Sequence, residues 1–295
     1  MGVMTVGAGS YRSGVQPEAG GSEREMAQEQ QLRRPVEFAT PPLIEVACGV
    51  QFKPIDGWST AHYGLFWSTL KSEYPLCEDH PPLPRLSPGD RPELEFELTA
   101  LPPLRRVYFI DQTGNFVIQL QPYRFLHNWR RIHETDVYPK FRAAFERFLH
   151  YWQKFTNFLR ENGLSGPEVE ICELTYLNHI YGPHWRFPRD LSKFLVVSDL
   201  TPISKAVAEP DGVALAFGSP LSQAPGRLDV TIRSGKRTAD EVDVLVLELT
   251  ARGQPVHLED EEQMHRWYVQ AHDAILLTFL SMTTEEAQVL WGRRS

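Results

Sequence analysis

Apolar and polar residues alternate along several stretches of the chain, as they do in strands with one buried face. In "PPLIEVACGVQF", residues 41–52, every second residue from Val46 to Phe52 is apolar. Similar runs predict further strands, and the short "DQTGN" at 111–115 predicts a hairpin turn. The strands are expected over 93–99, 105–111, 115–129, 168–180, 212–219, 226–235 and 242–251.

Apolar residues spaced by three and four positions predict the helices. The clearest run covers 138–163, with Pro139 suited to its first turn and Gly163 to its C-terminal cap. Its aromatic stripe indicates core packing against a sheet; a cofactor cradle is the alternative. Further helices are expected over 59–75, 188–200 and 264–282, and a last one after Thr284, whose hydroxyl is placed to cap the amide of Ala287.

Two stretches predict no regular structure. Residues 1–35 are rich in Gly, Ser, Gln and Glu without apolar periodicity, so we expect a disordered tail, and Met26 is a second candidate for the start of the protein. Residues 77–92 contain five prolines and are expected to form a loop.

The order of these elements predicts an α+β fold. Each half of the chain, 36–165 and 166–295, follows the order strand, helix, three strands, long helix. Two such β-α-β-β-β-α repeats would join into one curved antiparallel sheet, with the long helices packed on one face. Residue identity between the halves is slight, so this internal duplication rests on element order alone.

Composition narrows the class of protein. Hydrophobic residues make up 42% of the 295 residues, enough for a sizeable core, and no apolar run approaches the roughly 18 residues that span a bilayer. The net charge of −8 argues weakly against bulk attraction to nucleic acid. Cys48, Cys77 and Cys172 form no CxxC pair, and no signal peptide is apparent, so we expect a soluble, cytoplasmic protein without a disulfide framework.

Motifs for common chemistry are missing from the sequence. The ten histidines are scattered without metal-ligand spacing, and neither a GxSxG, a GxxxxGK[ST] nor a GxGxxG sequence occurs. We therefore predict no metal and no cofactor. Several glutamates lie in or beside strand-like runs, and alternation favours an outward position for them. They are Glu45, Glu95, Glu97, Glu173 and Glu248.

Six segments, in this order, resemble those of a sporadically distributed bacterial family of uncharacterised proteins about 250 residues long. The segments are "PPLIEVACGVQF", "HYGLFWSTLKSEYP", "RFLHNWRR", "YPKFRAAFERFLHYWQKF", "ELTYLNHI" and "AHDAILLTFLSMTTEEAQVLWGRR". The resemblance covers about residue 36 to the end. It implies no activity and no catalytic residue, and the patchy occurrence of the family suggests an accessory role, for example in defence against phage.

The segment "YRFLHNWRR", residues 123–131, is the main candidate site. As a strand it would place Arg124, Leu126, Asn128 and Arg130 on one face and its rings on the other, and we expect it to leave the core near His127. It is either an ordinary edge strand or a recognition surface built from arginine forks and rings. A second Asn-His pair ends the strand at 168–180. The predicted binding residues are Arg124, His127, Asn128, Trp129, Arg130, Arg131, Asn178 and His179.

Three functions remain open at this point. The first is a non-catalytic binding protein that holds a protein partner on its sheet, and this is the one we favour. The second is a nucleic-acid binder that uses the same surface. The third is an enzyme whose hydrolytic site combines Asn128, His127 and His179 with a strand glutamate. The sequence leaves the oligomeric state open.

Overall fold

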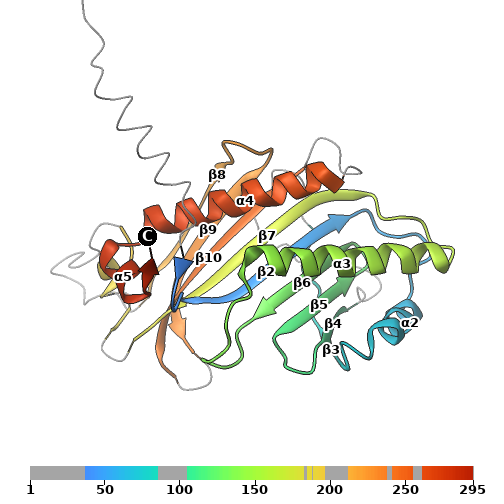
Figure 1. The fold of residues 1–295 in the computed structure, drawn as a ribbon, viewed down its shortest axis with the longest axis horizontal. Helices are drawn as coiled ribbons and strands as arrows, with labels where there is room; N and C mark the ends of the chain where they lie inside the picture. Colours follow the sequence, from blue (N-terminus) through green and yellow to red (C-terminus); the bar gives the residue numbers. More distant parts are fainter. Residues whose placement is uncertain are drawn as a thin grey trace, which may run out of the picture.

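The computed structural model describes residues 37–85, 105–182, 185–187, 189–196, 212–237, 241–254 and 261–294. They form a mixed α+β fold with a curved antiparallel sheet of nine strands, in the order β3-β4-β5-β6-β2-β7-β10-β9-β8 (Figure 1). The sheet strands are β2 (Leu43–Phe52), β3 (Leu76–His80), β4 (Arg106–Ile110), β5 (Phe116–Gln121), β6 (Arg124–Arg130), β7 (Val169–Ile180), β8 (Ala214–Pro220), β9 (Arg227–Lys236) and β10 (Asp243–Gly253). A separate pair joins β1 (Glu37–Phe38) to β11 (Arg293–Arg294).

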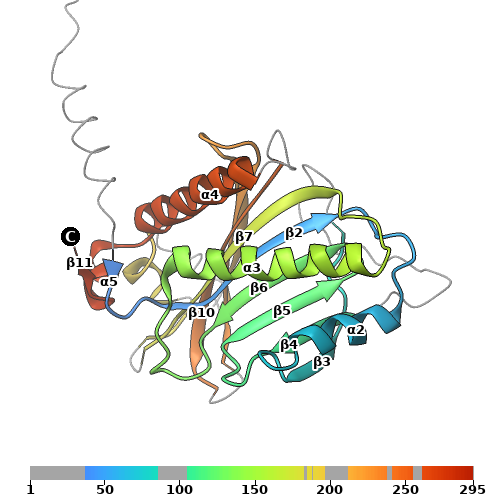
Figure 2. The same ribbon diagram turned by 45° about the vertical axis from the view of Figure 1, so that its right-hand side comes forward.

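The helices cover one face of the sheet. They are α2 (Thr60–Leu70), α3 (Lys140–Glu161), α4 (Glu261–Met282) and α5 (Glu285–Leu290), with a single 3-10 turn, η1 (Leu191–Lys193). In Figure 2, α3 crosses β6 and β2, while α4 lies on the side of β7 and β10. The curved antiparallel sheet with long helices on one face was predicted from the pattern, and the structure confirms it.

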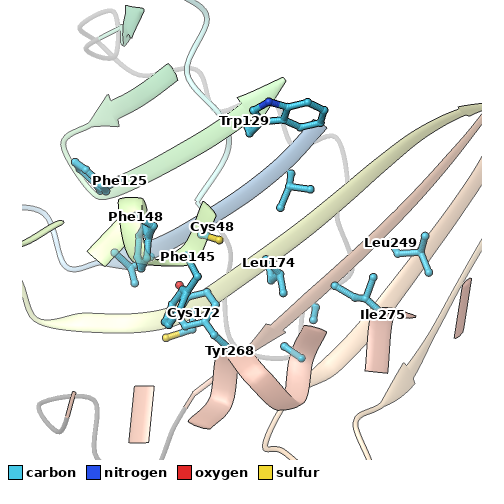
Figure 3. Close-up of a cluster of buried hydrophobic side chains, with 14 of the residues drawn as sticks. Cys48, Phe125, Trp129, Phe145, Phe148, Cys172, Leu174, Leu249, Tyr268 and Ile275 are labelled. Carbon is cyan, nitrogen blue, oxygen red and sulfur yellow. The ribbon is translucent and has the colours of Figure 1, made fainter. Parts of the chain in front are cut away.

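The aromatic stripe of α3 is part of the core. Phe145, Phe148 and Phe155 are almost completely buried, and the ring of Phe155 stacks on Phe125 of β6 with 5.4 Å between centroids. Tyr268 of α4 packs against Phe145 of α3 with 4.8 Å between ring centroids, so the two long helices contact each other through these side chains (Figure 3). Cys48 and Cys172 lie in the same core as free thiols, and burial raises the pKa of Cys172 to about 12.

Several sequence-based boundaries were wrong. The strand expected over 115–129 is a hairpin, β5 and β6, which turns at Pro122–Tyr123. The alternation of apolar residues changes phase at this turn. The residues that face the helices have even numbers up to Leu120 and odd numbers from Phe125 onward. The strand also does not leave the core near His127, since Trp129 is still 2% exposed.

Two more expectations changed. The start of the proline-rich loop forms the edge strand β3, which ends at His80 just before Pro81. The helical piece expected over 188–200 is only the single turn η1. The predicted tail over 1–35 and the strand over 93–99 lie outside the described residues.

The two halves of the chain meet at β2 and β7, the first strand of each half. Moving outward from this central pair, each half continues with its last strand, β6 or β10, and then with its earlier strands. Among the described residues of the first half, β3 was not predicted, and the strand predicted over 115–129 is the two strands β5 and β6. The division at residue 165 and the internal duplication stay predictions. None of the described helices is long and apolar enough to cross a membrane.

Candidate binding face

The face of the sheet turned away from α2, α3 and α4, called the helix-free face below, carries the charged strand residues. Strand alternation and register place them there, opposite the apolar positions that contact the helices. The central strands were predicted to be half-buried, but in the structure this second face is also shielded from solvent. Arg124, Asn128, Glu173 and Thr250 are each less than 8% exposed.

A ladder of alternating charges crosses this face from β6 to β9. Arg124 donates to the carboxylate of Glu173 at 3.0 Å, and Arg252 donates to the same oxygen at 2.7 Å. Arg252 also reaches Asp229 at 3.2 Å, and Arg227 donates to Asp229 at 2.7 Å. The order Arg124–Glu173–Arg252–Asp229–Arg227, called the charge ladder below, pairs every charge with an opposite one.

Gly49 makes the first step of the ladder possible. Arg124 lies on β6 and Glu173 on β7, so the guanidinium must cross β2 to reach its partner. Gly49 is the β2 residue directly opposite Glu173 and Leu126. It brings no side chain into this path, and a Cβ built there would lie 2.9 Å from the carbonyl oxygen of Phe125 and would collide with the side chain of Leu126.

The electrostatics of Glu173 follow from these contacts. Burial alone would raise the pKa of its carboxyl, but the nearby charges of Arg124 and Arg252 outweigh burial and hold the pKa below its usual value. The pKa of Arg252 follows the same balance. Burial would lower it, but Glu173 together with Asp229 and Glu248 outweighs burial and raises the pKa of the guanidinium. Both groups are therefore charged at neutral pH.

A second polar group lies beside the ladder. Asn128 of β6 donates through its amide nitrogen to Glu45 of β2, and Arg130 is the β6 residue directly opposite Glu45 in the strand register. Burial raises the pKa of Glu45 despite these two neighbours. The side-chain oxygen of Asn128 is buried and has no hydrogen-bond partner. Between this group and the ladder lie small side chains, Ala47, Thr175 and Thr250, the last two joined by a 3.0 Å hydrogen bond.

The predicted site residues divide between the two faces. Four belong to the helix-free face: Arg124, Asn128, Arg130 and the half-buried His179. Trp129 packs on Tyr138 in the core at 5.2 Å, and Asn178 is buried with its amide donating to the carbonyl of Leu247. The Asn-His pairs therefore do not meet in one site.

His127 also belongs to the core, where it contacts α3. Its Nε2 shares a 2.9 Å hydrogen bond with the hydroxyl of Tyr74, and its ring stacks on Tyr151. Burial, reinforced by the charge of Arg147, lowers the pKa of His127 to about 3. Arg131 donates at 3.3 Å to the carbonyl of Pro41. Neither side chain is available on the helix-free face.

Sequence reasoning missed the partners of Arg124. Glu173 was noted only as an outward strand glutamate, and Asp229 and Arg252 were not considered. One signal was present, because a glycine inside a strand, as at Gly49, often marks a place where another group approaches closely.

A second polar cluster was missed on the helix side of the sheet. There the hydroxyls of Tyr138 and Tyr176 share a 3.0 Å hydrogen bond, and the Tyr176 hydroxyl shares a 2.9 Å hydrogen bond with Nδ1 of His272.

Other sites are weaker. Within the described ranges, no three His, Cys, Asp or Glu side chains come together to hold a metal ion. A pocket of about 530 Å³ lies beside the start of β7. Its two cations are already paired, Lys53 with Glu168 at 2.5 Å and Arg85 with Glu170 at 2.7 Å.

The fold and this face together define the class of the protein as an α+β protein with a curved antiparallel sheet, helices on one face and a polar opposite face. No family model, no curated protein and no solved structure matches the chain.

Gly49→Ala is expected to destabilise the fold by about 1–3 kcal/mol, the usual cost of overpacking a filled interior. The added methyl would collide with Leu126 and narrow the path of Arg124. Gly166→Ala is the matched control, because a Cβ there meets no atom within 4 Å. Urea unfolding of both variants measures the difference, and equal midpoints would show that the sheet accommodates a side chain at residue 49.

Proposed function

We propose that this is a non-catalytic binding protein that holds a protein partner on the helix-free face. The observation that supports it best is a face of polar and charged side chains that the long helices do not cover, across β6, β2, β7, β10 and β9. Its central residues are buried, and its half-buried residues form the part that a partner can reach. The accessible hydrogen-bonding groups of this face include those of the half-buried His179 and Thr231.

The balance of charges favours a protein over a nucleic acid. A phosphate backbone is held by cations that have no other partner. In the charge ladder, Arg124, Arg252 and Arg227 are already paired with Glu173 and Asp229. Protein surfaces carry both signs of charge and match a mixed face of this kind.

The enzymatic alternative depends on Asn128, His127 and His179 facing one pocket. His127 points toward α3, whereas Asn128 and His179 belong to the helix-free face, so this constellation receives no support. The nucleic-acid alternative keeps one supporting feature. Tyr108 stacks on His80 at 3.8 Å and contacts Arg106 at the β3–β4 end of the face.

Site-specific crosslinking in the native host tests the proposal. A photoreactive amino acid is placed at Leu177 or Thr231, both half-buried residues of the helix-free face. The control position is Glu146, exposed on α3. We expect one discrete protein adduct from the sheet positions and none from the control. Adducts from Glu146 alone would contradict the assigned face.

Filter binding separates the nucleic-acid alternative. Mixed single-stranded DNA and RNA are offered at low and moderate salt, where phosphate contacts give a steep loss of binding as salt rises. We expect no retention at low salt. Retention that falls steeply with salt, and that Arg106→Ala removes, would replace the protein partner with a nucleic acid.

The resemblance to a sporadically distributed bacterial family extends the proposal to an accessory role in the cytoplasm, such as defence against phage. Deleting the gene from the native host and measuring phage plating efficiency tests this part. The crosslinked partner should then be needed for the same phenotype.

A further inference from the structure

The two edges of the nine-stranded sheet differ in how they are protected. The β3 edge, Leu76–His80, carries Glu78, Asp79 and His80, and charges of this kind discourage pairing with another strand. The β8 edge, Ala214–Pro220, has the sequence ALAFGSP without a single charge, and all seven residues are exposed. Two large apolar side chains, Leu215 at 40% and Phe217 at 51%, lie open on it.

The hydrogen bonds to β9 show which backbone groups of β8 face outward. Ser234 donates to the carbonyl of Val213, and Leu221 donates to the carbonyl of Gly226. Residues of β8 with odd numbers therefore bond to β9, because bonded positions alternate along an antiparallel pair. The N–H and C=O groups of Ala214, Ala216 and Gly218 point away from the sheet, and no described strand pairs with them.

We propose that a second copy of this chain pairs with β8 through its own β8, antiparallel, about a two-fold axis at Ala216. This register sets Ala216 opposite Ala216 and Ala214 opposite Gly218, so every outward N–H of these residues meets an outward carbonyl. It also sets Leu215 beside Phe217 of the second copy on the helix-bearing face. The result is one sheet that runs through both molecules, an isologous contact.

The chemistry of the strand favours self-pairing over another partner. A two-fold axis brings each residue near its own copy, so a charged edge such as β3 would place like charges together. β8 contains no charged residue. The residues whose backbone groups point outward, Ala214, Ala216 and Gly218, have small side chains or none, which leaves room for the backbone of the second copy. In the proposed register, the exposed Leu215 of each copy lies beside the exposed Phe217 of the other.

A charge exchange at Ala216 tests the proposal on the full chain. The mass of the wild-type protein in solution is expected to be twice that of one chain by sedimentation. Ala216→Lys and Ala216→Glu should each give monomers, because each variant would face its own charge. Mixing the two variants should restore a dimer that contains one of each. Leu290→Glu is the control, because Leu290 on α5 is also an exposed apolar residue, and this variant should remain dimeric.

The other outcomes overturn it. A monomeric wild-type protein at micromolar concentration, including one whose β8 binds a strand of a different protein, excludes the second copy. If both charged variants remain dimeric, the dimer interface lies elsewhere on the surface. If the variants are monomers with an unchanged circular dichroism spectrum but do not combine on mixing, residue 216 does not face itself.

Discussion

Glu173→Gln is expected to lower the free energy of unfolding by about 3–5 kcal/mol, the range seen when one member of a buried ion pair is removed. Glutamine keeps the shape of the side chain but leaves Arg124 and Arg252 beside a neutral group. Arg124 is only 4% exposed, so its charge would be left without compensation from water. Equilibrium unfolding in urea, followed by circular dichroism, measures the loss.

Glu170→Gln provides the matched control on the same strand. Glu170 also pairs with an arginine, Arg85, but that arginine side chain is 42% exposed. Water screens such a pair, so the substitution is expected to cost under about 1 kcal/mol. Similar losses for the two variants would mean that the burial of the charge ladder contributes nothing to stability.

Acidification is expected to destabilise the protein from pH 6.5 downward, above the range in which carboxylates of lowered pKa such as Glu173 titrate. Burial lowers the pKa of His127 to about 3 and that of His272 to about 4, whereas both take up protons near 6.5 in the unfolded chain. Protons therefore bind the unfolded state more strongly, and the stability present above pH 6.5 is lost as the pH falls. By pH 5 each histidine accounts for a loss of about 2 kcal/mol.

Unfolding in urea at half-unit steps between pH 7.5 and 5 checks this dependence. His127→Gln removes one of these groups, so it should reduce the slope, whatever it does to stability at pH 7.5. A wild-type stability that is flat over this range would show that neither histidine is held neutral by the fold.

The periodicity of the sequence predicted the core elements of this fold because periodicity depends on burial. The stripe from Phe141 to Leu159 predicted a helix packed against a sheet, and the alternation from Val46 to Phe52 predicted a half-buried strand. The hairpin at Pro122–Tyr123 was missed because its turn has only two residues. Its one trace in the sequence is the change of phase between Leu120 and Phe125.

The candidate site was predicted only in part, because alternation gives the face of a residue but not its neighbours. It correctly set Arg124, Asn128 and Arg130 apart from the rings of the same strand. It could not show that Arg124 reaches across β2 to Glu173, some fifty residues later in the chain, since that contact depends on the strand order. The strand order depends on the pairing of β2 with β7, and no local sequence pattern indicates that pairing.

The central pairing of β2 with β7 has a consequence for biosynthesis. β2 ends at Phe52 and β7 begins at Val169, so the ribosome completes the first half while one side of β2 still has no strand beside it. An open strand of ten residues invites aggregation. If the gene were cut near residue 165, each fragment would keep one such bare side, and only their co-expression would reassemble the whole.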